Sequence, residues 1–117
     1  MTLKPYSEIR DVHDLTNEDK QRIIDFLQGA IYDWCKNKPN EWFSMRDLMG
    51  GENYDWKGTP LFLLFEKYRG KGKSIDSAID YAGKDSGWLL KQVIHSDKRL
   101  FETKIQERIR KYRWIKN

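Results

Sequence analysis

The fold is decided by residues 74–115, which read SIDSAIDYAGKDSGWLLKQVIHSDKRLFETKIQERIRKYRWI. The first half predicts two helices, 75–82 and 86–96, because apolar residues recur there at helical spacing. Gly83 lies between them and readily takes the left-handed conformation that ends a helix. The expected buried faces consist of Ile75, Ala78, Ile79 and Ala82 in the first helix and Leu89, Leu90, Val93 and Ile94 in the second.

The second half of this stretch predicts a β-hairpin. Apolar and polar residues alternate over 100–105 and again over 110–115, which is typical of strands buried on one face. The connection has no Gly or Asn, so its turn type is not defined by the sequence. A single C-terminal helix over 105–116 is the alternative interpretation.

Helix, turn, helix and hairpin in this order resemble a winged helix-turn-helix. The resemblance is one of architecture, covers residues 74–115 and indicates no particular family. It implies an α+β, mostly helical, winged helix-like domain with a C-terminal β-hairpin. In such a domain the helix 86–96 would enter the major groove of DNA, and the hairpin would be the wing.

The preceding chain supplies the scaffold of one domain. Residues 1–15 have little periodicity and are expected to form an N-terminal arm, so that the single domain covers 16–117. Thr16 is a suitable N-cap for a helix that ends near Lys36. Further helices are expected over 45–49, after a short strand that joins the hairpin, and over 61–69, which is apolar nearly all round and should be buried at the centre.

The positive charge is concentrated in the C-terminal part. Residues 1–83 contain 12 Lys and Arg against 14 Asp and Glu, whereas residues 84–117 contain 10 against 4. This imbalance indicates an anionic partner for the C-terminal segment. A basic segment that is merely solvated is the alternative.

The helical phase of 86–96 gives candidate DNA contacts. The face opposite its buried stripe carries residues that reach base edges in the major groove, and the expected base contacts are Trp88, Lys91, Gln92 and His95. Basic residues on and around the hairpin are expected to bind phosphates: Lys84, Lys98, Arg99, Lys104, Arg108, Arg110, Lys111 and Arg113. The predicted function is binding of double-stranded DNA, in a regulatory role.

The composition argues against several other classes. No apolar run is long enough for a membrane span, and the N-terminus lacks a secretory signal. A lone Cys35 fits a reducing cytoplasm, and one Cys with two His argues against a zinc site built from these residues. No motif indicates a cofactor, and no Ser, Cys or His constellation indicates an enzyme.

Two other functions stay open. The first is a protein-interaction or dimerisation module that forms a homodimer, since five Trp suit an aromatic interface. More remotely, Glu102-x-Lys104 on a strand is similar to the acidic and lysine pair of metal-dependent nucleases. That function also requires an Asp on a neighbouring strand or loop well before the pair. Asp97 is too close to the pair, and Asp80 and Asp85 lie on or between predicted helices. Steep salt dependence would distinguish DNA binding from an aromatic protein interface.

Overall fold

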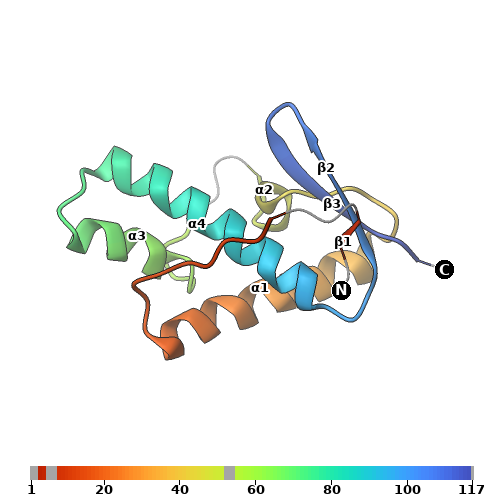
Figure 1. Ribbon diagram of the computed structural model, residues 1–117, viewed down its shortest axis with the longest axis horizontal. Helices are drawn as coiled ribbons and strands as arrows, with labels where there is room; N and C mark the ends of the chain where they lie inside the picture. Colours follow the sequence, from red (N-terminus) through yellow and green to blue (C-terminus); the bar gives the residue numbers. More distant parts are fainter. Residues whose placement is uncertain (1–2, 5–7, 52–54, 117) are drawn as a thin grey trace.

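The computed structural model describes residues 3–4, 8–51 and 55–116, so residues 1–2 and 5–7 of the predicted arm and residue 117 lie outside the described residues. The expected α+β, mostly helical domain with a C-terminal hairpin is confirmed (Figure 1). Its elements are β1 (Leu3–Lys4), α1 (Asn17–Asn37), α2 (Met45–Leu48), α3 (Phe62–Gly70), α4 (Ile75–Ser96), β2 (Phe101–Gln106) and β3 (Ile109–Trp114).

The helix α1 forms as predicted. The Thr16 side chain accepts a hydrogen bond from the backbone N–H of Asp19, and acidic residues in the first turn complement the helix dipole. Ile23, Leu27 and Ile31 fall on one stripe and are fully buried. This stripe anchors α1 against α4 in the single core cluster of the molecule.

The segment before α2 joins the sheet, as expected. Phe43 exchanges two backbone hydrogen bonds of 2.8 Å with Tyr112 of β3. Its ring is completely buried, and it meets Phe101 edge-on with ring centroids 6.3 Å apart. Directly after it, Ser44 and Asp47 form a capping box that starts α2.

The helix α3 lies at the edge of the core and not at its centre. Leu64 is its only residue that the structure buries, while Phe62, Phe65 and Tyr68 stay partly exposed. The reason is that α3 has α4 as its main neighbour, which leaves one side without a covering element (Figure 1). The predicted burial at the centre is therefore wrong.

The predicted turn at Gly83 is also wrong, because α4 is one continuous helix of 22 residues. The two residues expected to cap a second helix are engaged elsewhere. Asp85 accepts hydrogen bonds from α3, and the Ser86 hydroxyl donates to the Gly83 carbonyl at 2.7 Å. A glycine inside a helix costs only about 1 kcal/mol relative to alanine, which the packing of α4 against α1 and α3 outweighs.

The buried stripe of α4 agrees with the prediction in its second half. Leu89, Leu90, Val93 and Ile94 are all buried in the core cluster, as expected. In the first half Ala78 and Ala82 are buried, but Ile75 and Ile79 are 56% and 55% exposed. The first half of α4 packs against α3, where the rings of Tyr68 and Tyr81 are stacked, and Ile75 and Ile79 reach solvent.

The C-terminal residues form a hairpin, which rules out the alternative of a helix over 105–116. The strands β2 and β3 pair antiparallel from Phe101↔Trp114 to Gln106↔Ile109. The inner face, which packs on the helices, carries Phe101, Thr103 and Tyr112, all of them buried. The outer face carries Glu102, Lys104, Lys111 and Arg113, as the alternation predicts.

The N-terminal segment is part of the fold. β1 adds a third strand, parallel to β2, through the pair Leu3↔Phe101. From there the chain crosses α4 before α1 begins (Figure 1). Val12 is only 5% exposed and belongs to the core cluster. The described part of this segment is thus a covering layer on α4.

Candidate nucleic-acid interface

The predicted recognition face of α4 lies beneath this N-terminal segment. The Arg10 guanidinium lies 5.2 Å from the centroid of the Trp88 ring, and the Lys91 ammonium lies 5.2 Å from it as well. Lys91 is only 5% exposed, and Gln92 and His95 are partly buried. The expectation that this face is open to solvent is wrong for Lys91, because the helical phase of α4 cannot reveal the segment from a distant part of the chain that lies against Trp88 and Lys91.

The environment of Lys91 opposes its charge. Burial lowers the pKa of Lys91, and the nearby positive charge of Arg110 lowers it further, while Glu8 has the opposite effect. A charged group at this place is costly to the fold. In this arrangement Lys91 lies inside the molecule and does not reach toward a ligand.

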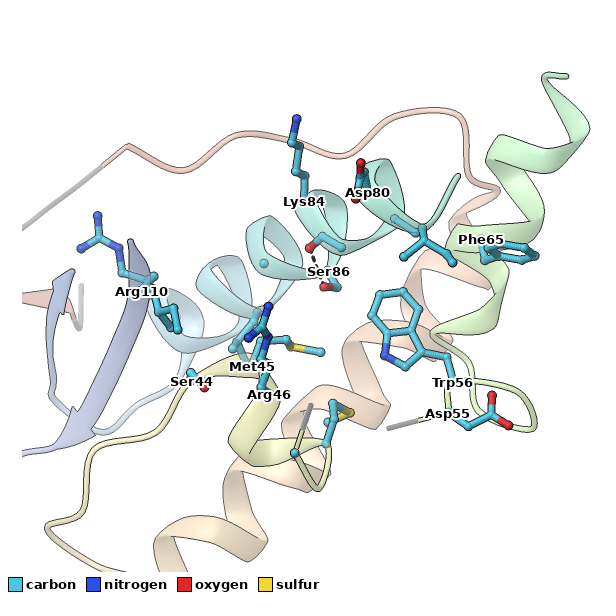
Figure 2. A pocket seen from close by; sticks show the side chains of 18 of the residues that line it. Ser44, Met45, Arg46, Asp55, Trp56, Phe65, Asp80, Lys84, Ser86 and Arg110 are labelled. Carbon is cyan, nitrogen blue, oxygen red and sulfur yellow. Dashed lines mark hydrogen bonds between the residues drawn. The ribbon is translucent and has the colours of Figure 1, made fainter. Parts of the chain in front are cut away.

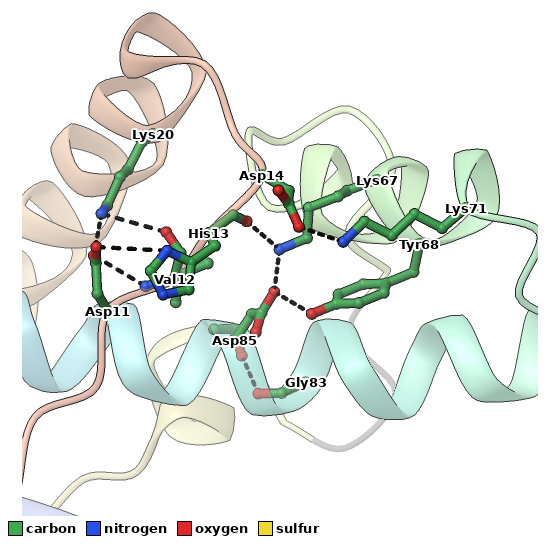
Figure 3. A network of polar contacts seen from close by, with 11 residues as sticks. Asp11, Val12, His13, Asp14, Lys20, Lys67, Tyr68, Lys71, Gly83 and Asp85 are labelled. Carbon is green, nitrogen blue, oxygen red and sulfur yellow. Dashed lines mark hydrogen bonds and ion pairs between the residues drawn. The ribbon is translucent and has the colours of Figure 1, made fainter.

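A polar network fixes the N-terminal segment across α3 and α4 (Figure 3). Lys67 Nζ donates to Asp85 Oδ2 at 2.6 Å and to the His13 carbonyl at 2.8 Å. The Tyr68 hydroxyl donates a hydrogen bond of 2.9 Å to the same carboxylate oxygen of Asp85. Burial, together with Asp85, raises the pKa of Tyr68 to about 12, so this phenol stays protonated and acts as a structural donor.

At the base of the hairpin, where β2 begins and β3 ends, the basic residues are paired. Arg99 donates to both carboxylate oxygens of Asp97, at 3.0 and 2.7 Å, and Gln28 donates to the same carboxylate at 2.8 Å. Arg113 donates to Glu102 at 2.6 Å across the strands. Both arginines therefore have structural roles in the fold, which the sequence pattern did not reveal.

The Asp97 carboxylate is well stabilised in its charged form. Burial alone would raise the pKa of Asp97, but hydrogen bonds from Arg99 and Gln28 outweigh this effect and lower it. The hydrogen bonds between Arg99 and Asp97 also raise the pKa of Arg99, so both partners are stabilised in their charged forms. The pair closes the junction between α4 and β2.

Nearer the tip, the basic residues have no such partners. Lys104 and Lys111 are directly opposite each other on the outer face of the hairpin, and Arg108 is exposed in the turn. Within the described part of the chain, none of these three residues forms a salt bridge. We call Lys104, Arg108 and Lys111 the tip cluster. Like charges in directly opposed positions destabilise a sheet, so the fold does not explain this pair.

Trp42 supports the outer face from one side. Its ring centroid lies 4.1 Å from the Lys104 ammonium and 4.7 Å from the Arg113 guanidinium. A cation over an indole face is held in place without being neutralised. The sequence analysis did not predict this contact of Trp42 with the hairpin. The signal was its position directly before Phe43, in the short strand that was expected to join the hairpin.

The turn itself is strained. Glu107 and Arg108 form a two-residue loop in which both have positive φ, 53° and 66°. Such a loop strongly favours Asn and Gly, since other residues resist this conformation. The hairpin thus keeps two charged side chains at its tip where glycine would be easier to accommodate.

The remaining predicted phosphate ligands are dispersed. Lys84 is exposed on α4, with its ammonium 5.6 Å from the centroid of the Tyr81 ring, and Lys98 is exposed after α4. Arg110 belongs to the inner face and donates to the Thr103 hydroxyl at 3.2 Å. The structure therefore divides the predicted basic set between the tip, the base and the helix.

A groove opens between α2, α4 and the hairpin tip, with a volume of about 800 Å³ (Figure 2). Arg46, Lys84 and Arg110 line it together with Trp56, which points toward α4. Sequence reasoning did not identify this groove, because its walls come from segments far apart in the chain.

Neither metal binding nor membrane insertion is indicated in the described residues. Among them, no group of three or more His, Cys, Asp or Glu residues is arranged to hold a metal ion. Glu102 is paired with Arg113 and Lys104 lies over Trp42, so both members of the nuclease-like pair have other contacts. The helices of the described segments also include none that could cross a membrane.

The chain was compared with protein-family models, with curated proteins and with solved structures, and none of them matches it.

Proposed function

We propose that the protein binds double-stranded DNA through the tip cluster of its hairpin, in a regulatory role. The observation that carries this proposal is the pair Lys104 and Lys111, two like charges directly opposed on the outer face with no acidic partner in the described chain. Phosphate oxygens between the two ammonium groups would turn their repulsion into attraction.

The neighbouring residues suit the same partner. Arg108 extends the positive charge to the end of the hairpin, in a strained turn that keeps the side chain exposed. Strained backbone that a protein retains is a reason to look for function. Contacts of this kind position a domain on DNA and do not read its sequence. In this proposal Trp88 and Lys91 make no base contact while the N-terminal segment lies against them, and the predicted base contacts of Gln92 and His95 are not used.

Salt dependence tests the proposal. We would titrate a labelled random duplex and follow its fluorescence anisotropy at 50 and 200 mM salt. Contact of the tip cluster with about three phosphates should weaken binding by about 40-fold between these concentrations, since each phosphate contributes about 0.9 to the logarithmic slope. Absence of binding at 50 mM salt by the folded protein would overturn the proposal.

A matched pair of variants locates the interface. Lys104→Gln with Lys111→Gln should reduce the logarithmic salt slope by about 1.8, because two phosphate contacts are lost. Lys36→Gln with Lys73→Gln removes the same charge from exposed positions at the end of α1 and before α4. If both double variants weaken binding equally, the attraction comes from net charge and the tip cluster is not the interface.

A further inference from the structure

The groove beside the hairpin has features that phosphate binding does not explain. Its floor is the middle of α4, one wall is α2, and the start of α3 closes one end while the hairpin closes the other (Figure 2). The lining is largely apolar, and its larger apolar side chains are Met45, Met49, Trp56, Phe62, Phe65 and Ile79. A duplex resting on the outer face of the hairpin would leave the exposed parts of these side chains, among which only Met49 is buried, in contact with water.

Ile79 contributes the most exposed apolar surface to this groove. It is 55% exposed, and Ile75, one turn earlier on α4, is 56% exposed. Contiguous apolar surface next to a cleft marks a place where a partner packs, because its burial is favourable by about 25 cal/mol per Å². The alternative function of a protein-interaction module is thus supported by a specific surface.

Two glycines of α4 show what kind of partner fits. Gly83 and Gly87 are one helical turn apart and both line the groove. A Cβ atom added to either would meet no atom within 4 Å, so packing inside the chain does not require glycine there. Each is less favourable than alanine in the interior of a helix. Their absent side chains let the backbone of a partner approach closely.

The charges around the groove are arranged in order. Arg108 and Arg110 lie on the hairpin and Arg46 on α2, whereas Asp55 lies beside Trp56 (Figure 2). Lys84 and Asp80 lie one turn apart on α4. A complementary partner is acidic where it meets the hairpin and apolar along α4. A nucleic-acid strand fits less well, since its phosphates would meet both aspartates and its bases would place polar edges against methionine and phenylalanine.

We propose that this groove binds an amphipathic, acidic helix of a partner protein. The apolar face of that helix packs on Ile79 and Trp56, its backbone passes over Gly83 and Gly87, and its carboxylates face the arginines of the hairpin. This is the helix-in-groove mode of recognition. The groove shares Arg108 with the tip cluster but neither Lys104 nor Lys111, and the inference does not depend on DNA binding.

A random library of 16-residue peptides displayed on phage tests this inference. We would select on the wild-type protein and measure the affinity of synthetic copies of the enriched peptides by fluorescence anisotropy. The selected peptides should carry net negative charge and apolar residues at helical spacing. Enrichment of basic peptides, or failure to enrich any sequence, would overturn the inference.

A glycine variant and its control show whether the peptides occupy the groove. Gly87→Leu fills the groove floor, and it should weaken peptide binding at least tenfold while the helix remains folded. Gly29→Leu is the matched control, because Gly29 is an exposed glycine inside α1 with no atom within 4 Å of an added Cβ. Equal affinity for both variants would show that the peptides bind elsewhere, against the inference.

The remaining outcomes separate this inference from the proposed function. Lys104→Gln with Lys111→Gln should leave peptide affinity unchanged, and Gly87→Leu should leave duplex affinity unchanged. A duplex that competes with the peptides and loses affinity in Gly87→Leu would show that the groove takes nucleic acid. Dimerisation that Gly87→Leu abolishes would assign the groove to a second copy of the chain. Either result would overturn the inference.

Discussion

The base and the tip of the hairpin both carry basic residues, but those at the base are paired with acidic side chains and those described at the tip are not. At the base, Arg99 is held by a buried carboxylate, and Arg113 is paired with Glu102 across the strands. At the tip, Lys104 and Lys111 are opposed to each other, and within the described residues neither has an acidic partner. The paired Glu102 and Arg113 are thus followed, only two residues further toward the tip on each strand, by the lysines that are available to a partner.

The largest expected effect concerns the base. Asp97→Ala should lower the free energy of unfolding by about 3 kcal/mol, since it leaves Arg99 partly buried without its partner. Glu102→Ala should cost less than about 1 kcal/mol, because both side chains of its pair with Arg113 are about a third exposed. Urea denaturation measures both values. Equal losses would contradict the distinction between a buried and an exposed pair.

The pair of Asp97 and Arg99 also determines how the free energy of unfolding changes at acidic pH. Because the pKa of Asp97 is lowered in the folded state, its contribution is complete above the unfolded value near 4 and is lost as pH falls through the folded pKa. The stability of the wild type should therefore fall more steeply below about pH 4 than that of Asp97→Ala. Parallel acid limbs for the two proteins would contradict this assignment.

A smaller change in the free energy of unfolding, of opposite sign, is expected at Lys91 on α4. Lys91→Met should raise the free energy of unfolding at pH 7 by about 1 kcal/mol, since it removes a charge from a buried position. Because the pKa of Lys91 is lowered in the folded state, the wild type should gain stability as pH rises toward the unfolded value near 10.4, and the variant should lack this gain. A loss of stability in Lys91→Met would show that the charge is needed there.

The turn should separate stability from binding. Glu107→Asn with Arg108→Gly replaces two residues of positive φ by those that favour it, and should stabilise the protein by up to about 1 kcal/mol in urea denaturation. The single variant Arg108→Gly should bind duplex DNA more weakly, because it removes one positive charge of the tip cluster and leaves the negative charge of Glu107 in place. Unchanged DNA affinity would remove Arg108 from the proposed interface.

The smallest effect on stability is expected for the tip lysines. Lys104→Gln with Lys111→Gln relieves the repulsion between them but loses the contact of Lys104 with Trp42. The two effects offset each other, so the free energy of unfolding should change by less than about 0.5 kcal/mol. A large decrease in the free energy of unfolding, measured by urea denaturation, would mean that these lysines stabilise the fold as Arg99 does.

Much of the fold could be predicted from local signals. The cap at Thr16 and the alternation of β2 and β3 involve residues close in sequence, and their predictions are confirmed. The turn at Gly83 was wrong because a single glycine is a weak signal against the packing of a long helix. The winged-helix resemblance stays a prediction.

The candidate site was less accessible to sequence reasoning. The phase of α4 was correct for Leu89 and Leu90, yet its other face is covered by a segment some 80 residues earlier in the chain. Likewise, the sequence gives no sign that Asp97 binds Arg99 whereas Lys111 has no acidic partner among the described residues. Such differences depend on which side chains meet in space, and periodicity does not encode them.

The most direct test uses the tryptophan side chains, because four of the five report on different surfaces. Trp42 lies on the outer face of the hairpin, Trp56 in the groove, Trp88 beneath the N-terminal segment, and Trp114 near Arg99 at the base. We would follow their indole N–H signals by NMR in ¹⁵N-labelled protein while adding a random duplex at low salt. We predict that Trp42 shifts most and that Trp88 and Trp114 stay in place. Shifts of Trp88 or Trp114 with an unmoved Trp42, or no shift at all, would contradict the assignment of DNA binding to the tip cluster.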